Sequence, residues 1–463
     1  MTASRLHRII GLASIGLLLA FVPFLRASTN FTSAWDEHAH LSYVQYTYEF
    51  KWPAPGYPMN TWGREAFACH PHHLYGPMAA AACGENGPGT SYPTGGANTA
   101  DGWPPIAYTV IANLSRPFFL FTDDALYAVR FGVVSLWTLG MLALFGLANR
   151  RGVSKVQSFT AILAITVLPG IGYFSSFVSP YAALPILTAY AFWTYDWLSA
   201  RLKSGCSLSR RTGTEGLAAA AFPAITILAV PHSISVVIAV SIGIGLTALR
   251  HLFKKGSLRP SLRSVLIGLS AALLTPLAYV VHRFYNAIRA WRAIEYPSDA
   301  SPDISEAVTS THNSDWFAEA QARAWNFFPR AIDSALPVPD LYRFVATLLT
   351  FVVVGIVIAR ALRLIESHDS GLLEVGILIA SPIGALIYYY SLSFEAPPRY
   401  GLPLALLGFA ILIVRKLPTR AIGVLVALAT LLFVFAVRSD PIYIEQPCWE
   451  VGANGYLQLC EPS

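Results

Sequence analysis

"RLHRIIGLASIGLLLAFVPFLRAS" (residues 5–28) places an unbroken apolar segment between Arg8 and Arg26. A helix that crosses a bilayer core about 30 Å thick needs about 20 mainly apolar residues, so we expect a membrane span near residues 9–25. A basic flank also begins secretory signal peptides. Here, however, the apolar stretch is long, and no small-x-small cleavage site follows before Asn30. We interpret the segment as an uncleaved first span.

The rest of the chain repeats this pattern. Its 463 residues have a mean hydropathy of +0.50, and 54% of them are apolar while only 13% are charged. These values predict an all-α polytopic membrane protein. About eleven transmembrane helices are expected, near residues 9–25, 127–148, 156–174, 180–198, 216–231, 233–249, 264–282, 343–360, 371–391, 400–414 and 420–437.

The distribution of charge orients these spans. With a cytoplasmic N-terminus, 19 of the 32 Lys and Arg residues fall on the inner side, together with only five of the 26 acidic residues. This is the asymmetry that the positive-inside rule describes. We expect a multi-pass protein of the plasma (inner) membrane with its active site on the extracytoplasmic face. The pI near 9.0 then reflects topology, and no nucleic-acid partner is expected.

Two of the expected outer segments, residues 26–126 and 283–342, are longer than simple connectors. The second contains an amphipathic pattern at residues 315–333 that suits a helix lying along the membrane surface. Neither segment suggests a soluble domain. We expect one transmembrane domain over residues 1–437 and a short outer tail over residues 438–463.

"GWPPIAYTVIANLSRPFFLF" (residues 102–121) is apolar enough to suggest a further span. Counting it as one would reverse the charge of the next loops, so we interpret it as an interfacial or partly re-entrant helix. Pro104 and Pro105 would begin that helix, and Trp103 and Tyr108 would lie at headgroup depth.

Four of the five cysteines fall in expected outer segments. Cys69 and Cys83 lie in the first outer loop, Cys448 and Cys460 in the outer tail, and Cys206 on the cytoplasmic side. Two short-range outer pairs suit an oxidising compartment. We expect disulfides between Cys69 and Cys83 and between Cys448 and Cys460, with four free thiols as the alternative.

"SAWDEHAHLSYV" (residues 33–44) is unusually polar for a segment that directly follows a membrane span. In a helix, Asp36, His40 and Tyr43 share one face and Glu37 lies beside His40. The chain thus gathers carboxylates, imidazole and phenol at the expected outer surface.

Three interpretations of this stretch stay open. Ser33 and Asp36 suit a capping box, in which Glu37 compensates the helix dipole. A carboxylate at the membrane surface could instead accept a proton from an acceptor hydroxyl. No cofactor is required, but a divalent metal is a third interpretation, although the histidine spacing matches no strong zinc motif; its ligands would come from His38, His40, His70, His72 and His73.

The stretch "WDEHAHLSYV" resembles the first-loop motif of GT-C glycosyltransferases, polytopic enzymes that use lipid-phosphate-linked sugars. Three later segments fit in the family's order. "GWPPIAYTVIANL" (102–114) and "DALYAVRFGVVSLWTLGMLALFGLANRRG" (124–152) are similar to motifs of the family, and "EAPPRYGLPLAL" (395–406) resembles the entrance to a late span in an uncharacterised bacterial branch. One departure is "SSFVSPYAAL" (175–184). Ser179 and Tyr181 occupy the places where relatives often carry Asn-Pro followed by an acidic or amide residue, so no second carboxylate is assigned there.

The resemblance implies transfer of a sugar from a polyprenyl-phosphate donor to an extracytoplasmic glycan, lipid or protein acceptor. Asp36 would be the general base, and Glu37 would orient Asp36 or the acceptor. Arg399 would bind the phosphate, since a guanidinium can hold phosphate oxygens bidentately. The remaining candidates for substrate or phosphate binding are His40, Tyr43, Tyr400, Arg130 and Arg330.

Structural roles compete with several of these assignments. Interfacial anchoring also explains Arg399 and Tyr400, and snorkelling explains Arg130 and Arg330. A hydrogen-bonded structural histidine explains His40.

Two other functions fit parts of the pattern. A transporter or flippase of lipid-linked glycans would be expected to carry ionisable residues near the midplane, and the expected spans have almost none. A polysaccharide ligase or polymerase would use Arg and His in a late outer loop, where His312 and Arg323 lie.

Overall fold

The described part of the computed structural model is almost entirely helical, which fits an all-α membrane protein. It comprises residues 3–30, 32, 37–53, 57–70, 82–85, 87, 92, 96, 98, 100, 103–204, 210–254, 262–291, 340–366, 372–392, 401–438, 449–451 and 457–459.

The elements follow one another as helices and short 3-10 turns, with one pair of strands at the end. They are α1 (Ala3–Ala27), α2 (Glu37–Tyr48), α3 (Thr61–Cys69), α4 (Ile106–Ser115), η3 (Arg116–Leu120), α5 (Ala125–Arg150), α6 (Lys155–Val167), α7 (Pro169–Tyr173), η4 (Pro180–Ala183), α8 (Leu184–Ser204), α9 (Arg210–Ala229), η5 (Pro231–Ser233), α10 (Ile234–Lys254), α11 (Leu262–Trp291), α14 (Asp340–Glu366), α15 (Leu372–Leu392), α16 (Leu402–Phe409), α17 (Ile411–Val414), α18 (Thr419–Arg438), β1 (Trp449–Val451) and β2 (Leu457–Leu459).

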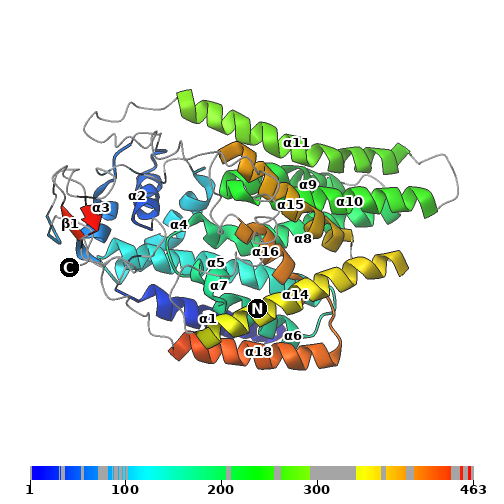
Figure 1. Cartoon of the computed structure of the whole chain (residues 1–463), viewed down its shortest axis with the longest axis horizontal. Helices are drawn as coiled ribbons and strands as arrows, with labels where there is room; N and C mark the ends of the chain where they lie inside the picture. The colour runs from blue at the N-terminus through cyan, green and yellow to red at the C-terminus, as the bar shows by residue number, and fades with distance from the viewer. Residues whose placement is uncertain are drawn as a thin grey trace.

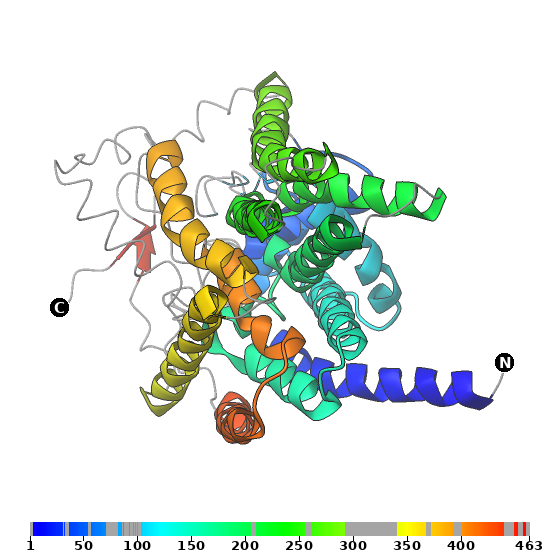
Figure 2. The same ribbon diagram turned by 90° about the vertical axis from the view of Figure 1, so that its right-hand side faces the viewer.

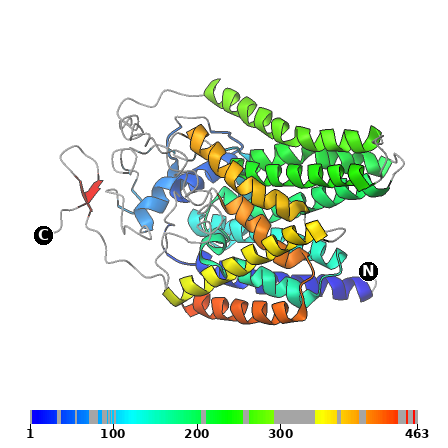
Figure 3. The ribbon, with the colours of Figure 1, turned by 45° about the vertical axis from the view of Figure 1, so that its right-hand side comes forward.

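The long helices run along the long axis of the molecule, while α2, α3 and β1 gather at one end, here called the α2 end (Figure 1). Figure 2 looks from the opposite end and shows α1 leaning outward from the other helices. In Figure 3, α14 and α15 lie between the pair α10 and α11 and the last helix, α18. The polar loops of the α2 end are thus set apart from an apolar bundle.

Among the described residues, four helical segments are long and apolar enough to cross a membrane: Ala125–Arg150, Pro231–His251, Asp340–Leu362 and Thr419–Val437. Shorter apolar helices occupy Ala13–Ala27, Lys155–Val167, Gly213–Ala229, Leu372–Gly384 and Leu402–Val414. Every one of the eleven expected segments overlaps a helix, but the number of spans stays a prediction. Proline divides one of them, because α6 ends at Val167 and α7 begins at Pro169.

Both ends of α5 are capped by local sequence. The Asp124 side chain accepts hydrogen bonds from the amides of Leu126 and Tyr127, as expected of an N-cap. At the other end Gly152 has a φ of +69°, and the amide of Val153 donates to the carbonyl of Ala148. This left-handed glycine cap ends the helix directly after its basic pair.

Close helix packing depends on glycine. A Cβ atom at Gly376 of α15 would collide with the carbonyl oxygen of Ala239 in α10, and one at Gly140 of α5 would meet the amide nitrogen of Ile186 in α8 at 2.6 Å. The backbones of these helix pairs are therefore in direct contact. Such contacts fix the bundle on which the α2 end is built.

The segment with the double proline forms a short helix, as expected. α4 begins at Ile106, directly after Pro105, and contains ten residues. Tyr108 is fully buried and faces α2, so its side chain packs against the protein. The headgroup depth expected for Trp103 and Tyr108 stays a prediction.

Strands β1 and β2 pair antiparallel in the C-terminal tail, with Trp449 opposite Leu459. Cys448 and Cys460 are the next residues outward in the chain, and they lie outside the described part. Their disulfide stays a prediction. The expected amphipathic helix at residues 315–333 lies outside it as well.

Candidate functional site

The first turn of α2 is held by a buried ion pair. Arg130, in the second turn of α5, donates from Nε to Glu37 Oε1 at 2.9 Å and from Nη2 to Oε2 at 2.7 Å. The amide of Val178 donates to the same Oε1 at 2.7 Å, and Arg130 Nη1 donates to the carbonyl of Thr29 at 2.8 Å. Glu37 thus ties α2 to α5 and to the segment before η4.

Glu37 was expected to orient Asp36 or the acceptor, and Arg130 was a candidate for substrate or phosphate binding. Both side chains are fully buried and pair with each other, and their expected roles stay predictions. The guanidinium of Arg130 also lies over the ring of Phe177, at 4.7 Å from its centroid. A bidentate pair with backbone partners positions chain segments. Asp36, the residue before Glu37, lies outside the described part.

His40 and Tyr43 face α4 from the next turn of α2. His40 Nδ1 and the Tyr108 hydroxyl are hydrogen-bonded at 2.7 Å, and the Tyr43 hydroxyl donates to the carbonyl of Trp103 at 2.8 Å. The rings of Tyr43 and Tyr108 stack with their centroids 4.1 Å apart. These contacts fix the orientation of the His40 imidazole.

Tyr181 and His232 approach the same place from η4 and η5. The Tyr181 hydroxyl and His232 Nδ1 are hydrogen-bonded at 2.7 Å. The Trp103 ring makes edge contacts with His232, Tyr181 and His40, at centroid distances of 4.9, 5.6 and 5.8 Å. Trp103 therefore joins the two hydrogen-bonded pairs.

We call this group the aromatic–histidine cluster; its members are His40, Tyr43, Trp103, Tyr108, Tyr181 and His232. It combines imidazole and phenol groups, which donate and accept hydrogen bonds, with aromatic surface. Tyr181 and His232 were not among the site residues expected from the sequence. The sequence features that could have indicated them are weak: Tyr181 stands where the family often has an acidic residue, and His232 is a lone histidine in the turn "VPHS" (230–233) between two apolar segments.

The segment "EAPPRYGLPLAL" (395–406) leads into α16, which lies near this cluster. α16 begins at Leu402, two residues after Tyr400, and packs against η5, which carries His232. Arg399 and Tyr400 themselves lie outside the described residues, as do Arg330, His312 and Arg323.

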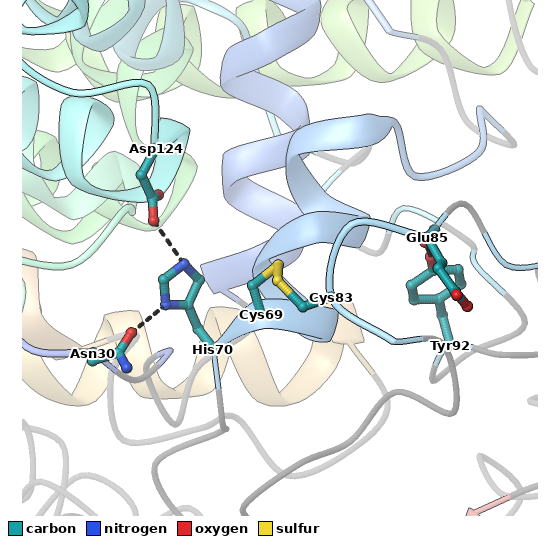
Figure 4. Close-up of a disulfide and its surroundings, with 7 residues drawn as sticks. All are labelled: Asn30, Cys69, His70, Cys83, Glu85, Tyr92 and Asp124. Atoms are coloured by element: carbon teal, nitrogen blue, oxygen red, sulfur yellow. Dashed lines mark hydrogen bonds and ion pairs between the residues drawn. A yellow bond between two sulfur atoms is a disulfide. The ribbon is translucent and has the colours of Figure 1, made fainter.

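His70 connects the first loop to the start of α5 (Figure 4). Its Nδ1 atom lies 2.7 Å from Asn30 Oδ1, and its Nε2 atom lies 3.0 Å from Asp124 Oδ2. Burial by itself would raise the pKa of the Asp124 carboxyl. The hydrogen bond and charge of His70, with the amides of Leu126 and Tyr127, outweigh burial and hold that pKa below its ordinary value.

A disulfide joins Cys69 to Cys83 beside this contact (Figure 4), which is the pairing that the sequence analysis expects in the first loop. Cys69 ends α3, and His70 follows it directly. The disulfide therefore restrains the segment that presents His70 to Asp124.

The metal interpretation stays a prediction. The Nδ1 atom of His70 contacts Asn30 and its Nε2 atom contacts Asp124. The ring centroids of His38 and Phe67 lie 3.6 Å apart. Within the described part of the chain no group of three or more His, Cys, Asp or Glu side chains could hold a metal ion. His72 and His73 lie outside that part.

Comparisons with known proteins give one distant structural similarity. None of the protein-family models matches this chain, and no curated protein matches it. The chain is similar to the oligosaccharyltransferase of Archaeoglobus fulgidus, crystallised with zinc and sulfate, with a TM-score of 0.41 and 14% sequence identity over 96% of this chain. The alignment spans about half, 54%, of that longer protein.

Proposed function

We propose that this chain transfers a sugar from a polyprenyl-phosphate-linked donor to an acceptor on the extracytoplasmic side of the membrane. The observation that carries the proposal is the concentration of polar groups at the α2 end of an apolar bundle. There the anchored Glu37 directly follows Asp36 in the chain, and the aromatic–histidine cluster adjoins it. The ordered resemblance to GT-C motifs supports the same function.

In the proposed reaction Asp36 is the general base. The acceptor hydroxyl gives its proton to the Asp36 carboxylate while its oxygen bonds to the anomeric carbon of the sugar. The bond from that carbon to the phosphate oxygen breaks, and the polyprenyl phosphate leaves with the electron pair. Attack opposite the leaving group inverts the anomeric centre.

Glu37 and Arg130 then have positioning roles. Because Arg130 and the Val178 amide occupy the Glu37 carboxylate, Glu37 fixes the start of α2 and so the backbone next to Asp36. Glu37 thereby orients Asp36, which is one of the two roles that the resemblance implies for it, and Arg130 acts through Glu37.

Arg399 remains our proposed phosphate ligand. Its segment leads into α16, and α16 packs against η5 beside His232. A guanidinium there would neutralise charge that develops on the departing phosphate. His40, held by Tyr108, would face the acceptor or the phosphate from the α2 side.

The test compares two neighbouring carboxylates in purified protein reconstituted in nanodiscs. Radiolabelled polyprenyl-phosphate sugars serve as donors, and a membrane extract of the native cells serves as acceptor. Asp36→Asn is expected to lower the transfer rate about 10²–10⁴-fold, the usual contribution of a general base, with an unchanged melting temperature. Glu37→Gln is expected to lower rate and melting temperature together.

Glu49→Gln is the matched control, because Glu49 follows α2 and forms its ion pair with Lys51 at the protein surface. Its rate and stability should equal those of the wild type. Transfer at the wild-type rate by a normally folded Asp36→Asn protein would exclude Asp36 as the base. Movement of intact labelled donor across the bilayer, without transfer, would favour the flippase function.

A further inference from the structure

Phe50 has a backbone conformation that is unusual for a bulky residue. Among the described residues it is the only non-glycine residue with a positive φ, +58°. Such a conformation is unfavourable for a bulky side chain and persists when the surrounding contacts enforce it. Backbone hydrogen bonds from the Phe50 amide to the Thr47 carbonyl and from the Lys51 amide to the Tyr46 carbonyl hold this turn as a left-handed cap of α2. The cap leaves Phe50 85% exposed.

The Arg116 side chain packs against the Phe50 ring. The Arg116 guanidinium lies 4.4 Å from the ring centroid of Tyr48 and 5.2 Å from that of Phe50, and its Nη2 donates to the Tyr48 carbonyl at 3.1 Å. Phe119 packs on Tyr48 at 5.4 Å. The turn after α2 and the turn η3 are therefore one surface.

Two further apolar side chains project from the same surface. Leu120 and Phe121 are each 83% exposed, and they immediately precede the capped start of α5. The three exposed residues Phe50, Leu120 and Phe121 form what we call the apolar tip. Charged Lys51 and exposed Asp123 border it in the chain, so apolar and ionic groups meet along one edge.

Aromatic contacts connect η3, which carries Leu120 of the apolar tip, to an exposed apolar side of the bundle. Phe118 of η3 contacts Phe131 of α5 at 5.5 Å, and Phe131 stacks on Phe24 of α1 at 5.0 Å. From Phe24 the exposed apolar surface continues along α1 through Phe21 and Leu17. α5 itself is apolar and long enough to cross a membrane.

We propose that the apolar tip inserts into the lipid bilayer beside α5, with Arg116 at the depth of the phospholipid phosphates. Large apolar side chains that would be costly in water become favourable among acyl chains, and an arginine stacked on aromatic rings suits a phosphate at the interface. The element at residues 102–121 is thus interfacial, but its membrane contacts are Leu120 and Phe121, whereas Tyr108 faces the protein interior. This inference does not depend on the proposed enzymatic activity.

Depth-dependent quenching tests the proposal in the full-length protein. Single cysteines at positions 50 and 121 carry an environment-sensitive fluorophore in phosphatidylcholine nanodiscs, in a background in which Cys206, Cys448 and Cys460 are replaced by Ser and the Cys69–Cys83 disulfide stays oxidised. Lipids with a nitroxide at acyl carbon 5 should strongly reduce fluorescence at both positions. Leu139, half exposed in the middle of α5, should instead respond most to a nitroxide deep in the acyl chain.

Glu85 is the control, because it is exposed in the same outer loop. Its label should respond to aqueous iodide and not to lipid nitroxides. Labels at 50 and 121 that behave like the Glu85 label would overturn the proposal.

A second variant removes the Phe50 side chain and keeps the backbone conformation of the turn. Phe50→Gly keeps the turn, because glycine adopts positive φ without strain. The label at position 121 should then be quenched less by the shallow nitroxide, because one of three inserting side chains is gone. Unchanged quenching at 121 would remove Phe50 from the apolar tip.

Discussion

Two buried carboxylates, one at each end of the bundle, are paired in different ways. At the α2 end both oxygens of Glu37 are bound, by Arg130 and by a backbone amide. At the opposite end the Nε atoms of Arg360 and Arg415 share the single Oε1 atom of Glu374, at 3.0 and 3.2 Å. Within the described residues, Oε2 of Glu374 accepts no hydrogen bond, and the contact from Arg415 Nε is an ion pair without a hydrogen bond.

The two groups also differ in exposure and in charge balance. Glu37 and Arg130 are fully buried, whereas the side chains of Arg360 and Arg415 are 20% and 16% exposed. Arg151 pairs with the more exposed Asp196 beside them. Three arginines therefore surround two carboxylates.

The different pairing indicates that the Glu37 pair and the Glu374 group have different structural roles. A closed bidentate pair has one geometry and suits a place where the chain must be held for chemistry. A group with shared ligands and excess positive charge tolerates rearrangement, and it suits the expected cytoplasmic end, where positive charge sets orientation.

The largest expected effect is at the closed pair. Arg130→Met leaves the Glu37 carboxylate buried without its partner, so we expect a loss of about 3–5 kcal/mol of unfolding free energy. Denaturant titration in detergent measures it, with Arg360→Met as the matched change at the opposite end. The double variant Glu37→Leu/Arg130→Met should recover most of the loss. Equal losses of unfolding free energy for Arg130→Met and Arg360→Met would show that the two ends are held equally firmly.

Next in size is the disulfide of the α2 end. Cys69 and Cys83 are 14 residues apart, and a closed loop of about that length contributes about 3 kcal/mol. Cys69→Ser should lower the unfolding free energy by roughly this amount, while Cys206→Ser should leave it unchanged. If both variants melt like the wild type, the first loop is held by other contacts.

Glu374→Gln should have a smaller effect, because the amide keeps an oxygen for the arginines and because these are partly exposed. We expect a loss of about 1–2 kcal/mol, in the range for disturbing one partner of a buried hydrogen bond. The same denaturant titration measures it. A loss as large as that of Arg130→Met would show that the opposite end is equally rigid.

The smallest effect concerns pH. The folded state holds the pKa of Asp124 below its ordinary 3.8, so its contribution to stability is present above that pH and is lost as pH falls through the folded pKa. Asp124→Asn removes the charge but retains a good N-cap. Between pH 5 and pH 3 the melting temperature of the wild type should therefore fall more than that of Asp124→Asn. Parallel curves would show that His70 does not stabilise the carboxylate.

Much of the helical arrangement could be predicted from the sequence, because it follows from local properties. Apolar length placed the helices, the double proline marked the start of α4, and the short spacing of Cys69 and Cys83 indicated their pairing. Charge predicted the orientation of the spans, although the structure does not test it.

The contacts of the site could not be predicted in the same way. Glu37 and Arg130 lie 93 residues apart, and only the packing of α5 against the first loop brings them together. The inward direction of Tyr108 depends on α2, and the pairing of Tyr181 with His232 depends on two separate turns. Sequence periodicity gives a helix its faces, but it does not say which face meets which neighbour.

The contacts of Glu37 also set an order for biosynthesis. Its amide partner, Val178, follows it by 141 positions. At about 5–20 residues per second, the ribosome needs roughly 7–30 s to make that stretch. Arg130 follows Glu37 by only 93 positions, so for the first two thirds of this interval the nascent chain has neither partner, and for the last third it has Arg130 alone. A membrane insertase or chaperone that shields this acidic segment would therefore act before α5 and the segment before η4 have both been made.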